Sequence, residues 1–257
     1  MKIALCSMIN DGFLIAFEGF IKSLLKNNPW FDLDIILIDL KTSGKTKFKC
    51  LEYYPKINFI QPKYGNYRKV NFTRTQEILK CTYYKLDAFS YYDDYDRIIF
   101  IDLDTIVLKD ISYLFNLECP LGGCKGYNRT RDVFRDDINS GVFVINKENL
   151  CKEIYFGLIR QARVGYSMPD QKTINLYFKG RITYLDKRYN CEKRMMVSKN
   201  FKDKFDDAYI IHYISQKPWD IQKDRNNQGF EAVEKIWWDY YRMKEEEWRT
   251  EWAEKNL

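Results

Sequence analysis

Two aspartates stand at the end of an apolar segment, Asp102 and Asp104 in the stretch from 97 to 107. Five of the six residues from 98 to 103 are apolar, which predicts a strand buried on both faces of an α/β sheet. Ionised carboxylates buried without partners cost several kcal/mol, so both must emerge at the strand end or meet hydrogen bonds, a base or a cation. In an extended chain residues i and i+2 project the same way, so this pair can hold a divalent cation. The alternative is that the aspartates only close the strand and open a turn.

A histidine and a lysine much later in the chain are further candidates for this site. His212 is the only histidine and lies in the apolar segment 208 to 214, which predicts another buried strand. A hydrogen-bonded core histidine is the alternative to a ligand. Lys217, followed by Pro218 and Trp219, sets a cation in a stiffened loop just past the strand end. Two carboxylates and one imidazole favour Mn²⁺ or Mg²⁺, and Mn²⁺ tolerates nitrogen better.

Lys85 lies in the segment 74 to 92, whose apolar residues recur at helical spacing and predict a helix leading into the strand of the aspartates. An exposed lysine is the alternative to a ligand-binding one. The charged segment 128 to 137 predicts an exposed loop, which is either solvated surface or a loop that faces the substrate.

Two short polar motifs precede predicted elements in the second half of the chain. Asn139 and Ser140 come before an apolar strand at 142 to 145, where ordinary turn chemistry is the alternative to a binding role. Asp170 and Gln171 open a helical pattern, and Asp170 can equally cap that helix.

The first half of the chain alternates strands and helices. Residues 2 to 8 predict a strand, Asn10 or Asp11 can cap the helix that follows, and further strands are expected at 34 to 39 and 57 to 60. This alternation predicts a largely parallel sheet, and the helix start at the first turn would offer N–H groups to an anionic ligand.

The C-terminal segment from 228 to 256 predicts one helix whose aromatic residues recur at helical spacing. From 231 onward it carries eight acidic and five basic residues, so an anionic lipid surface is an unfavourable partner. We expect this helix to pack onto the domain, with a homodimer contact as the alternative.

Composition limits the function classes. A length of 257 residues without a linker, repeat or low-complexity stretch predicts one domain. The net charge of +6 is too small for a dedicated nucleic-acid binder but suits an acidic ligand such as a nucleotide. Seven scattered cysteines without a C-x-x-C pair favour free thiols, and no apolar run approaches about 18 residues. We therefore expect a cytoplasmic protein without a transmembrane segment, and a viral protein would lie in the host cytoplasm. The alternative is a protein attached peripherally to a membrane.

From residue 1 to about 219 the chain resembles the family 8 glycosyltransferases, which include glycogenin and bacterial lipopolysaccharide galactosyl- and glucosyltransferases. The resemblance is carried by an ordered series of motifs: Asn10-Asp11, Tyr84-Lys85-Leu86, Ile101-Asp102-Leu103-Asp104, Asn139-Ser140-Gly141-Val142, Asp170-Gln171, Tyr189-Asn190, His212-Tyr213 and Lys217-Pro218-Trp219. It implies a single domain with a Rossmann-like GT-A fold around a mixed, mostly parallel sheet. In that fold residues 1–106 form the nucleotide-binding half, 107–219 the acceptor half with the return to the metal site, and 220–257 a helical extension.

The resemblance also implies a metal-dependent, retaining transfer of a hexose from a UDP-sugar to a glycan, glycolipid or glycoprotein acceptor. Asp102, Asp104 and His212 would coordinate Mn²⁺ or Mg²⁺. Asp170 or Gln171 would be the catalytic residue that stabilises the transition state. The donor would be bound by nine residues: Ser7, Asn10, Phe13, Lys85, Asp102, Leu103, Asn139, Ser140 and Lys217.

Two positions depart from the family pattern. The segment from His212 to Trp219 is one residue shorter than in the family and lacks its glycine, which affects the expected phosphate contacts. Phe13 stands where a uracil-stacking tyrosine is common, so a nucleotide other than UDP stays an alternative. The rival functions are a sugar nucleotidyltransferase, which also needs carboxylates and Mg²⁺, and a non-catalytic module that binds a glycan or nucleotide.

Overall fold

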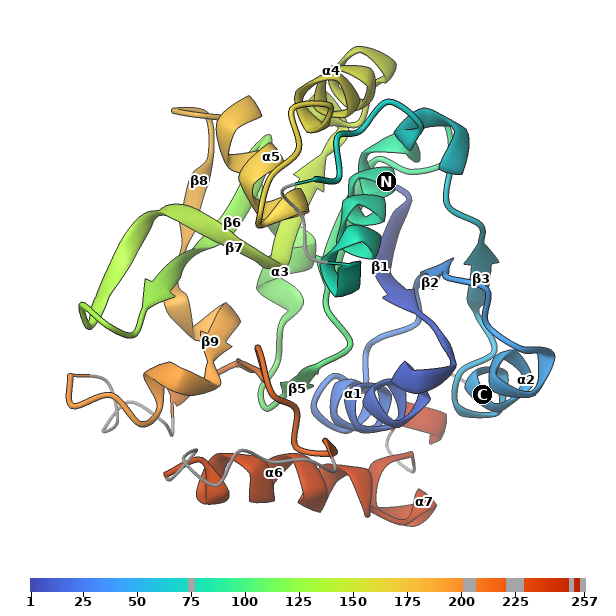
Figure 1. The fold of residues 1–257 in the computed structure, drawn as a ribbon. Coiled ribbons are helices and arrows are strands. Elements are labelled where there is room, and N and C mark those ends of the chain that lie inside the picture. Colours follow the sequence, from blue (N-terminus) through green and yellow to red (C-terminus); the bar gives the residue numbers. More distant parts are fainter. Residues whose placement is uncertain (74–76, 201–206, 221–228, 250–251, 255–257) are drawn as a thin grey trace.

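The computed structural model describes the chain apart from residues 74–76, 201–206, 221–228, 250–251 and 255–257 (Figure 1). Its strands are β1 Ile3–Ile9, β2 Asp34–Asp39, β3 Ile57–Ile60, β4 Arg97–Ile101, β5 Thr105–Val107, β6 Leu121–Asn128, β7 Val133–Asn146, β8 Thr183–Leu185, β9 Cys191–Glu192 and β10 Ile210–His212. Its α-helices are α1 Leu14–Asn27, α2 Gly44–Tyr53, α3 Ser112–Asn116, α4 Lys152–Ala162, α5 Pro169–Tyr177, α6 Glu231–Tyr241 and α7 Glu245–Trp248. Among the 3-10 segments, η1 spans Asp11–Phe13, η3 Glu77–Ser90, η5 Lys187–Asn190 and η6 Lys193–Met195.

The central sheet has seven strands in the order β3-β2-β1-β4-β7-β6-β8. The pairs β1–β2, β2–β3, β1–β4 and β6–β8 are parallel, whereas β4–β7 and β6–β7 are antiparallel. The predicted mixed, mostly parallel sheet flanked by helices is therefore confirmed. A second sheet, in the order β5-β10-β9, carries the chain back toward the end of β4.

Both faces of the central sheet are covered by apolar residues. On one face Leu5 and Ile99 pack with Phe17 and Phe20 of α1. On the other face lie residues of β1, β2 and β4, which pack with η3 and α4. Because neighbouring strand residues point to opposite faces, the unbroken apolar runs in β2 and β4 are what a sheet covered on both sides requires.

The apolar stretch that contains the two aspartates holds two strands, and the predicted buried strand is the first of them. β4 ends at Ile101, and the extended chain resumes at Thr105 in the second sheet. The Asp102 amide donates to Gly141 O at 2.8 Å, while the Asp104 carbonyl accepts from the Tyr213 amide at 2.8 Å. The backbone thus changes partner from β7 to β10 between the two aspartates, which bends the chain there.

Four other predictions differ from the structure in part. The charged segment 128 to 137 is a β-hairpin rather than a loop, because β7 begins at Val133 and runs beyond the core to pair with β6. The predicted C-terminal helix is divided, since α6 ends at Tyr241 and α7 begins at Glu245. Asp170 lies in the first turn of α5, where Met168 is the N-cap residue. The segment from 74 to 92, predicted as a helix, forms the 3-10 segment η3. Residues 74 to 76 of the prediction lie outside the described residues.

The C-terminal helices pack onto the domain, as predicted, and the alternative of a homodimer contact has no support. Trp237 of α6 is fully buried, and a Cβ added to Gly19 of α1 would lie 3.0 Å from its Nε1 atom. The Trp252 indole donates to Phe31 O at 2.6 Å, and Lys22 of α1 donates to the carbonyl oxygens of Tyr241, at the end of α6, and Met243. None of the helices within the described residues has both the length and the apolar character that a membrane crossing needs.

Candidate active site

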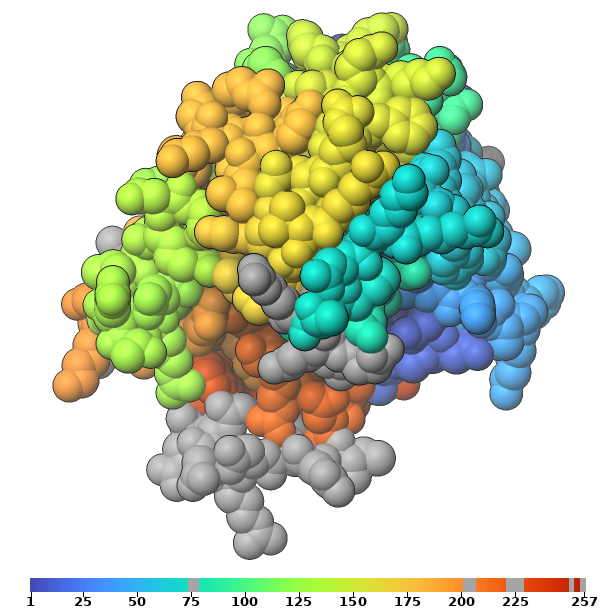
Figure 2. All heavy atoms as spheres, turned by 45° about the horizontal axis from the view of Figure 1, so that its top comes forward, coloured from blue at the N-terminus to red at the C-terminus, as the bar shows by residue number. Residues whose placement is uncertain are grey.

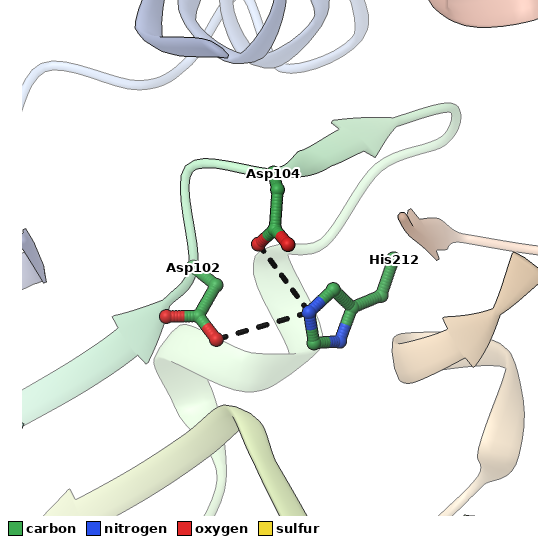
Figure 3. A group of neighbouring side chains, drawn as sticks. All are labelled: Asp102, Asp104 and His212. Atoms are coloured by element: carbon green, nitrogen blue, oxygen red, sulfur yellow. Dashed lines mark ion pairs between the residues drawn. The ribbon is translucent and has the colours of Figure 1, made fainter. Parts of the chain in front are cut away.

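Asp102, Asp104 and His212 meet at the point where the two sheets join (Figure 3). Asp102 follows β4, Asp104 precedes β5 and His212 ends β10. The His212 Nε2 atom lies 3.3 Å from Asp104 Oδ1 and 3.8 Å from Asp102 Oδ2. One ligand atom from each residue lies within 4.8 Å of the others, so the three side chains that the sequence analysis joined are brought together.

The neighbours of His212 determine which ring nitrogen faces the carboxylates. The Gly141 amide donates to Asn139 Oδ1 at 2.8 Å, which identifies this atom as the oxygen of the amide group. Asn190 Nδ2 donates to the same oxygen at 3.0 Å, so Asn190 Oδ1 is left to accept from His212 Nδ1 at 2.9 Å. In the neutral imidazole Nδ1 then carries the proton, and the lone pair of Nε2 points at the two aspartates.

Gly141 makes room for this imidazole. A Cβ added there would lie 2.1 Å from His212 Cε1 and 2.4 Å from Nδ1. Any larger residue would displace the ring, so the glycine is explained by close approach rather than by backbone conformation.

Each of the two aspartates forms an ion pair with a different lysine. Lys85 Nζ lies 2.6 Å from Asp102 Oδ2, and Lys217 Nζ forms an ion pair with Asp104 Oδ2. Burial raises the pKa of Asp104, but Lys217 and His212 together outweigh burial and hold this pKa well below the usual range. Burial also raises the pKa of Asp102, which Lys85 lowers and Asp104 raises again, leaving it above its ordinary value. Burial lowers the pKa of Lys85, yet its carboxylate neighbours raise it overall.

Asp170 is linked to this centre through Lys85 and Ser140. Its Oδ2 atom lies 3.4 Å from Lys85 Nζ and accepts from Ser140 Oγ at 2.6 Å. Asp170 and Gln171 are 5% and 7% exposed, so both are buried, and Gln171 directly follows Asp170 in the chain. Lys85, predicted as either exposed or ligand-binding, is buried at 6% exposure.

The predicted donor-binding residues of the first turn lie at the same end of the sheet as Asp102. Ser7 is one position beyond the Cys6–Phe100 pair of β1 and β4, and its buried hydroxyl has no hydrogen-bond partner among the described residues. Asn10 accepts from the Phe13 amide at 3.1 Å and so caps η1. The Phe13 ring contacts Trp219 edge to face, with centroids 6.2 Å apart.

Leu103 and Asn139 offer a ligand fewer groups than their residue types suggest. The Leu103 side chain is 2% exposed and belongs to the core, so only its backbone is available to a ligand. The Asn139 oxygen already accepts two hydrogen bonds, so its Nδ2 atom is the side-chain atom left to contact a ligand.

A model of the family described as Glycosyl transferase family 8 matches residues 3–223 of this chain. The chain belongs to glycosyl transferase family 8. Glycosyltransferase GlyE of Streptococcus pneumoniae is 27% identical over 177 residues, covering 63% of this chain and 41% of GlyE. UDP-glucuronate:xylan alpha-glucuronosyltransferase 2 of Arabidopsis thaliana is 32% identical over 139 residues, covering 51% of this chain and 22% of the plant protein. The matches thus span less than half of either relative.

The fold of this family 8 chain is that of a solved galactosyltransferase. LgtC, in complex with donor and acceptor sugar analogs, superimposes with a TM-score of 0.70 over 96% of this chain and 99% of LgtC, at 18% identity. The crystal structure of GlyE gives a TM-score of 0.69 at 23% identity, covering 98% of this chain and 63% of that chain. The predicted GT-A fold and the resemblance to family 8 are both confirmed.

For two residues near the site, the sequence pattern predicted no individual role. Asn190 was noted only as part of a motif, and its contact with His212 depends on side-chain orientation that no sequence pattern encodes. Arg135 lay within the segment expected to be a loop. With the Gln171 amide oriented so that its oxygen faces Arg135, the guanidinium donates to it at 2.8 and 3.2 Å.

Proposed function

We propose that this chain is a metal-dependent, retaining glycosyltransferase that moves a hexose from a UDP-sugar to a glycan, glycolipid or glycoprotein acceptor. The observation that carries the proposal is the convergence of Asp102, Asp104 and His212 between two lysines, in a chain of family 8. The family favours this reaction over the sugar nucleotidyltransferase that the residues alone left open.

The three side chains fit a divalent cation. Two carboxylate oxygens and one imidazole nitrogen suit Mn²⁺, or Mg²⁺ less well because of the nitrogen. The hydrogen bond of His212 Nδ1 to Asn190 orients the other ring nitrogen as a ligand, which is the usual arrangement around metal-binding histidines. The cation would neutralise charge that develops on the diphosphate as the sugar leaves.

In the proposed reaction the bond between the anomeric carbon and the diphosphate breaks, and a bond to an acceptor hydroxyl oxygen forms. The acceptor proton ends on the released UDP. Lys217 would stabilise the negative charge of the departing phosphate, and Lys85 would hold the donor sugar or its phosphates beside Asp102. Asp170 or Gln171 would stabilise the positive charge of the sugar in the transition state, with Asn139 and Ser140 bound to its hydroxyls.

We assign residues 1–106 to the nucleotide-binding half, 107–219 to the acceptor half and 220–257 to a helical extension. Ser7, Asn10 and Phe13, together with the Leu103 backbone, would bind the nucleoside. The position of Ser7 beside the end of β4, with an unpartnered hydroxyl, supports this assignment.

The proposal is tested by incubating the full chain with UDP-sugars and Mn²⁺, without an acceptor, and measuring released UDP and free sugar. We expect slow hydrolysis of one donor that EDTA abolishes and Mn²⁺ restores. Absence of both hydrolysis and Mn²⁺-dependent UDP binding with every donor would rule the proposal out.

Replacing Asn190 by alanine is expected to weaken Mn²⁺ affinity by about 10- to 100-fold, because His212 loses the acceptor that fixes its orientation. Calorimetric titration of Mn²⁺ in the presence of UDP measures this. Asn149→Ala is the matched control, since Asn149 is also buried, at 8% exposure, but lies in the turn after β7. Equal affinities in the two variants would contradict the role of Asn190.

A further inference from the structure

A groove with a volume of about 650 Å³ lies between α5 and the outer part of β7. Arg135 and Asp137 of β7 form one wall, Lys172 and Asn175 of α5 the other, and Tyr184 of β8 also contributes. Figure 2 shows the hairpin of β6 and β7, in green, beside the yellow to orange surface of α5 and the segment that follows it.

Arg135 connects this groove to the catalytic centre. Its guanidinium contacts the side chain of Gln171, and the same residue lines the groove. Asn175 follows Gln171 by one helical turn and exchanges two hydrogen bonds with the backbone of Ile138, at 2.8 and 2.9 Å. From Gln171 to the end of α5 at Tyr177 the helix rises roughly 9 Å, the scale of a short oligosaccharide.

The charges of the groove do not cancel. Asp137 pairs with Arg135 at 3.3 Å, and Asp136 pairs with Lys125 at 3.1 Å. Lys172 and Lys179, which line the same groove, have no acidic partner among the described residues. Two ammonium groups are therefore available to an anionic ligand.

Tyr184 supplies a fixed aromatic surface in this groove. Its side chain is held by a hydrogen bond from the hydroxyl to Asp136 O at 2.5 Å, yet the residue is 47% exposed. Lys125 Nζ lies 4.6 Å from the ring centroid. An exposed ring held in place beside cations offers both apolar contact and charge to a sugar ring that bears an acid group.

We propose that this groove binds the acceptor substrate, and that the acceptor is a glycan carrying anionic groups, carboxylate or phosphate. This inference rests on the proposed transferase function. The acceptor chain leads from its reacting hydroxyl near Gln171 along α5, where Lys172 and Lys179 bind its anionic groups and Tyr184 contacts a sugar ring.

The test has a binding arm that does not depend on turnover. The full chain is titrated calorimetrically with tetragalacturonate, a mannose-6-phosphate-terminated oligomannose, and the neutral counterpart of each. We expect at least one anionic glycan to bind at least about tenfold more tightly than its counterpart, and added KCl to reduce this preference. Equal binding of all the glycans, or binding of none, would overturn the proposal. The member of the anionic pair that binds identifies carboxylate or phosphate.

The charge-reversed variant Lys172→Glu/Lys179→Glu locates the binding. Its affinity for the preferred anionic glycan should fall at least about tenfold, since two attractions become repulsions. UDP-sugar hydrolysis without acceptor should stay within about twofold of the unaltered chain. The control Lys45→Glu/Lys152→Glu makes the same charge change at exposed lysines of α2 and α4.

The two proposals fail in different ways. Loss of affinity in both double variants would show a general charge effect and overturn the groove assignment. Absence of UDP-sugar hydrolysis in the unaltered chain would contradict the proposed function, while the binding arm would still decide whether the groove takes an anionic glycan.

Discussion

Replacing Asp104 by asparagine is expected to reduce sugar transfer by about 1,000-fold or more, with the fold retained. Asp104 is 5% exposed and is the carboxylate that both His212 and Lys217 contact. Asparagine keeps its size but removes its charge, so the variant would lose a carboxylate of the proposed metal site and leave Lys217 without its carboxylate partner. A metal that stabilises a transition state contributes several kcal/mol, and about 1.4 kcal/mol corresponds to each tenfold in rate. Released UDP measures transfer, and calorimetry with Mn²⁺ measures nucleotide binding.

The control for Asp104→Asn is Asp239→Asn. Asp239 forms an exposed ion pair with Lys235 on α6, and such pairs contribute little to stability. This variant should retain transfer, and both variants should unfold cooperatively near the temperature of the unaltered chain. If Asp104→Asn keeps Mn²⁺-dependent UDP binding and transfer, the assignment of the metal site is wrong.

Periodicity predicted the parallel half of the fold well because its strands are buried on both faces. The strands at 34–39 and 57–60 have the predicted bounds, and the first strand is shifted by a single residue. The pairing of the strand after Ile101 was harder to predict. Residues 105 to 107 are extended and buried, as their sequence suggests, but they pair with β10, about 100 residues further along the chain. An apolar pattern indicates burial and not the partner, so the change of sheet could not be predicted.

In the charged hairpin, by contrast, the sequence pattern did not indicate a strand at all. At its outer end β7 extends beyond the core, so the residues from 133 to 137 are exposed or half-buried and carry no strand periodicity. For this reason the segment that contains Arg135 was predicted as a loop, and the contact of Arg135 with Gln171 could not be predicted.

The meeting of Asp102, Asp104 and His212 followed from residue types, motif order and family resemblance. The side-chain amide groups that orient His212 could not be predicted in this way. Asparagines are common in turns, and nothing in the sequence distinguishes Asn190, which orients His212, from Asn10, which caps η1. The role of Asn190 follows from hydrogen-bond direction, which the backbone amide of Gly141 fixes through Asn139, whereas Asn10 accepts from the Phe13 amide.

Replacing Lys85 by methionine is expected to destabilise the metal-free protein by roughly 3–5 kcal/mol and to abolish measurable transfer. Lys85 is buried between Asp102 and Asp170, so its removal leaves two buried carboxylates without this cation. For a chain of this size the melting temperature should fall by about 10 °C. Mn²⁺ with UDP should recover part of this loss, because a ligand that binds only the folded state stabilises it.

Lys22→Met separates this effect from the loss of any buried lysine. Lys22 is similarly buried, at 8% exposure, but it donates to the carbonyl oxygens of Tyr241 and Met243 and lies on α1. Its replacement should also lower the melting temperature, yet Mn²⁺ with UDP should stabilise that variant no more than the unaltered chain, and transfer should persist. Thermal unfolding with and without Mn²⁺ compares the two. If Lys85→Met retains transfer, or gains no more stability from Mn²⁺ than Lys22→Met does, Lys85 is a structural lysine and its proposed contact with the donor is wrong.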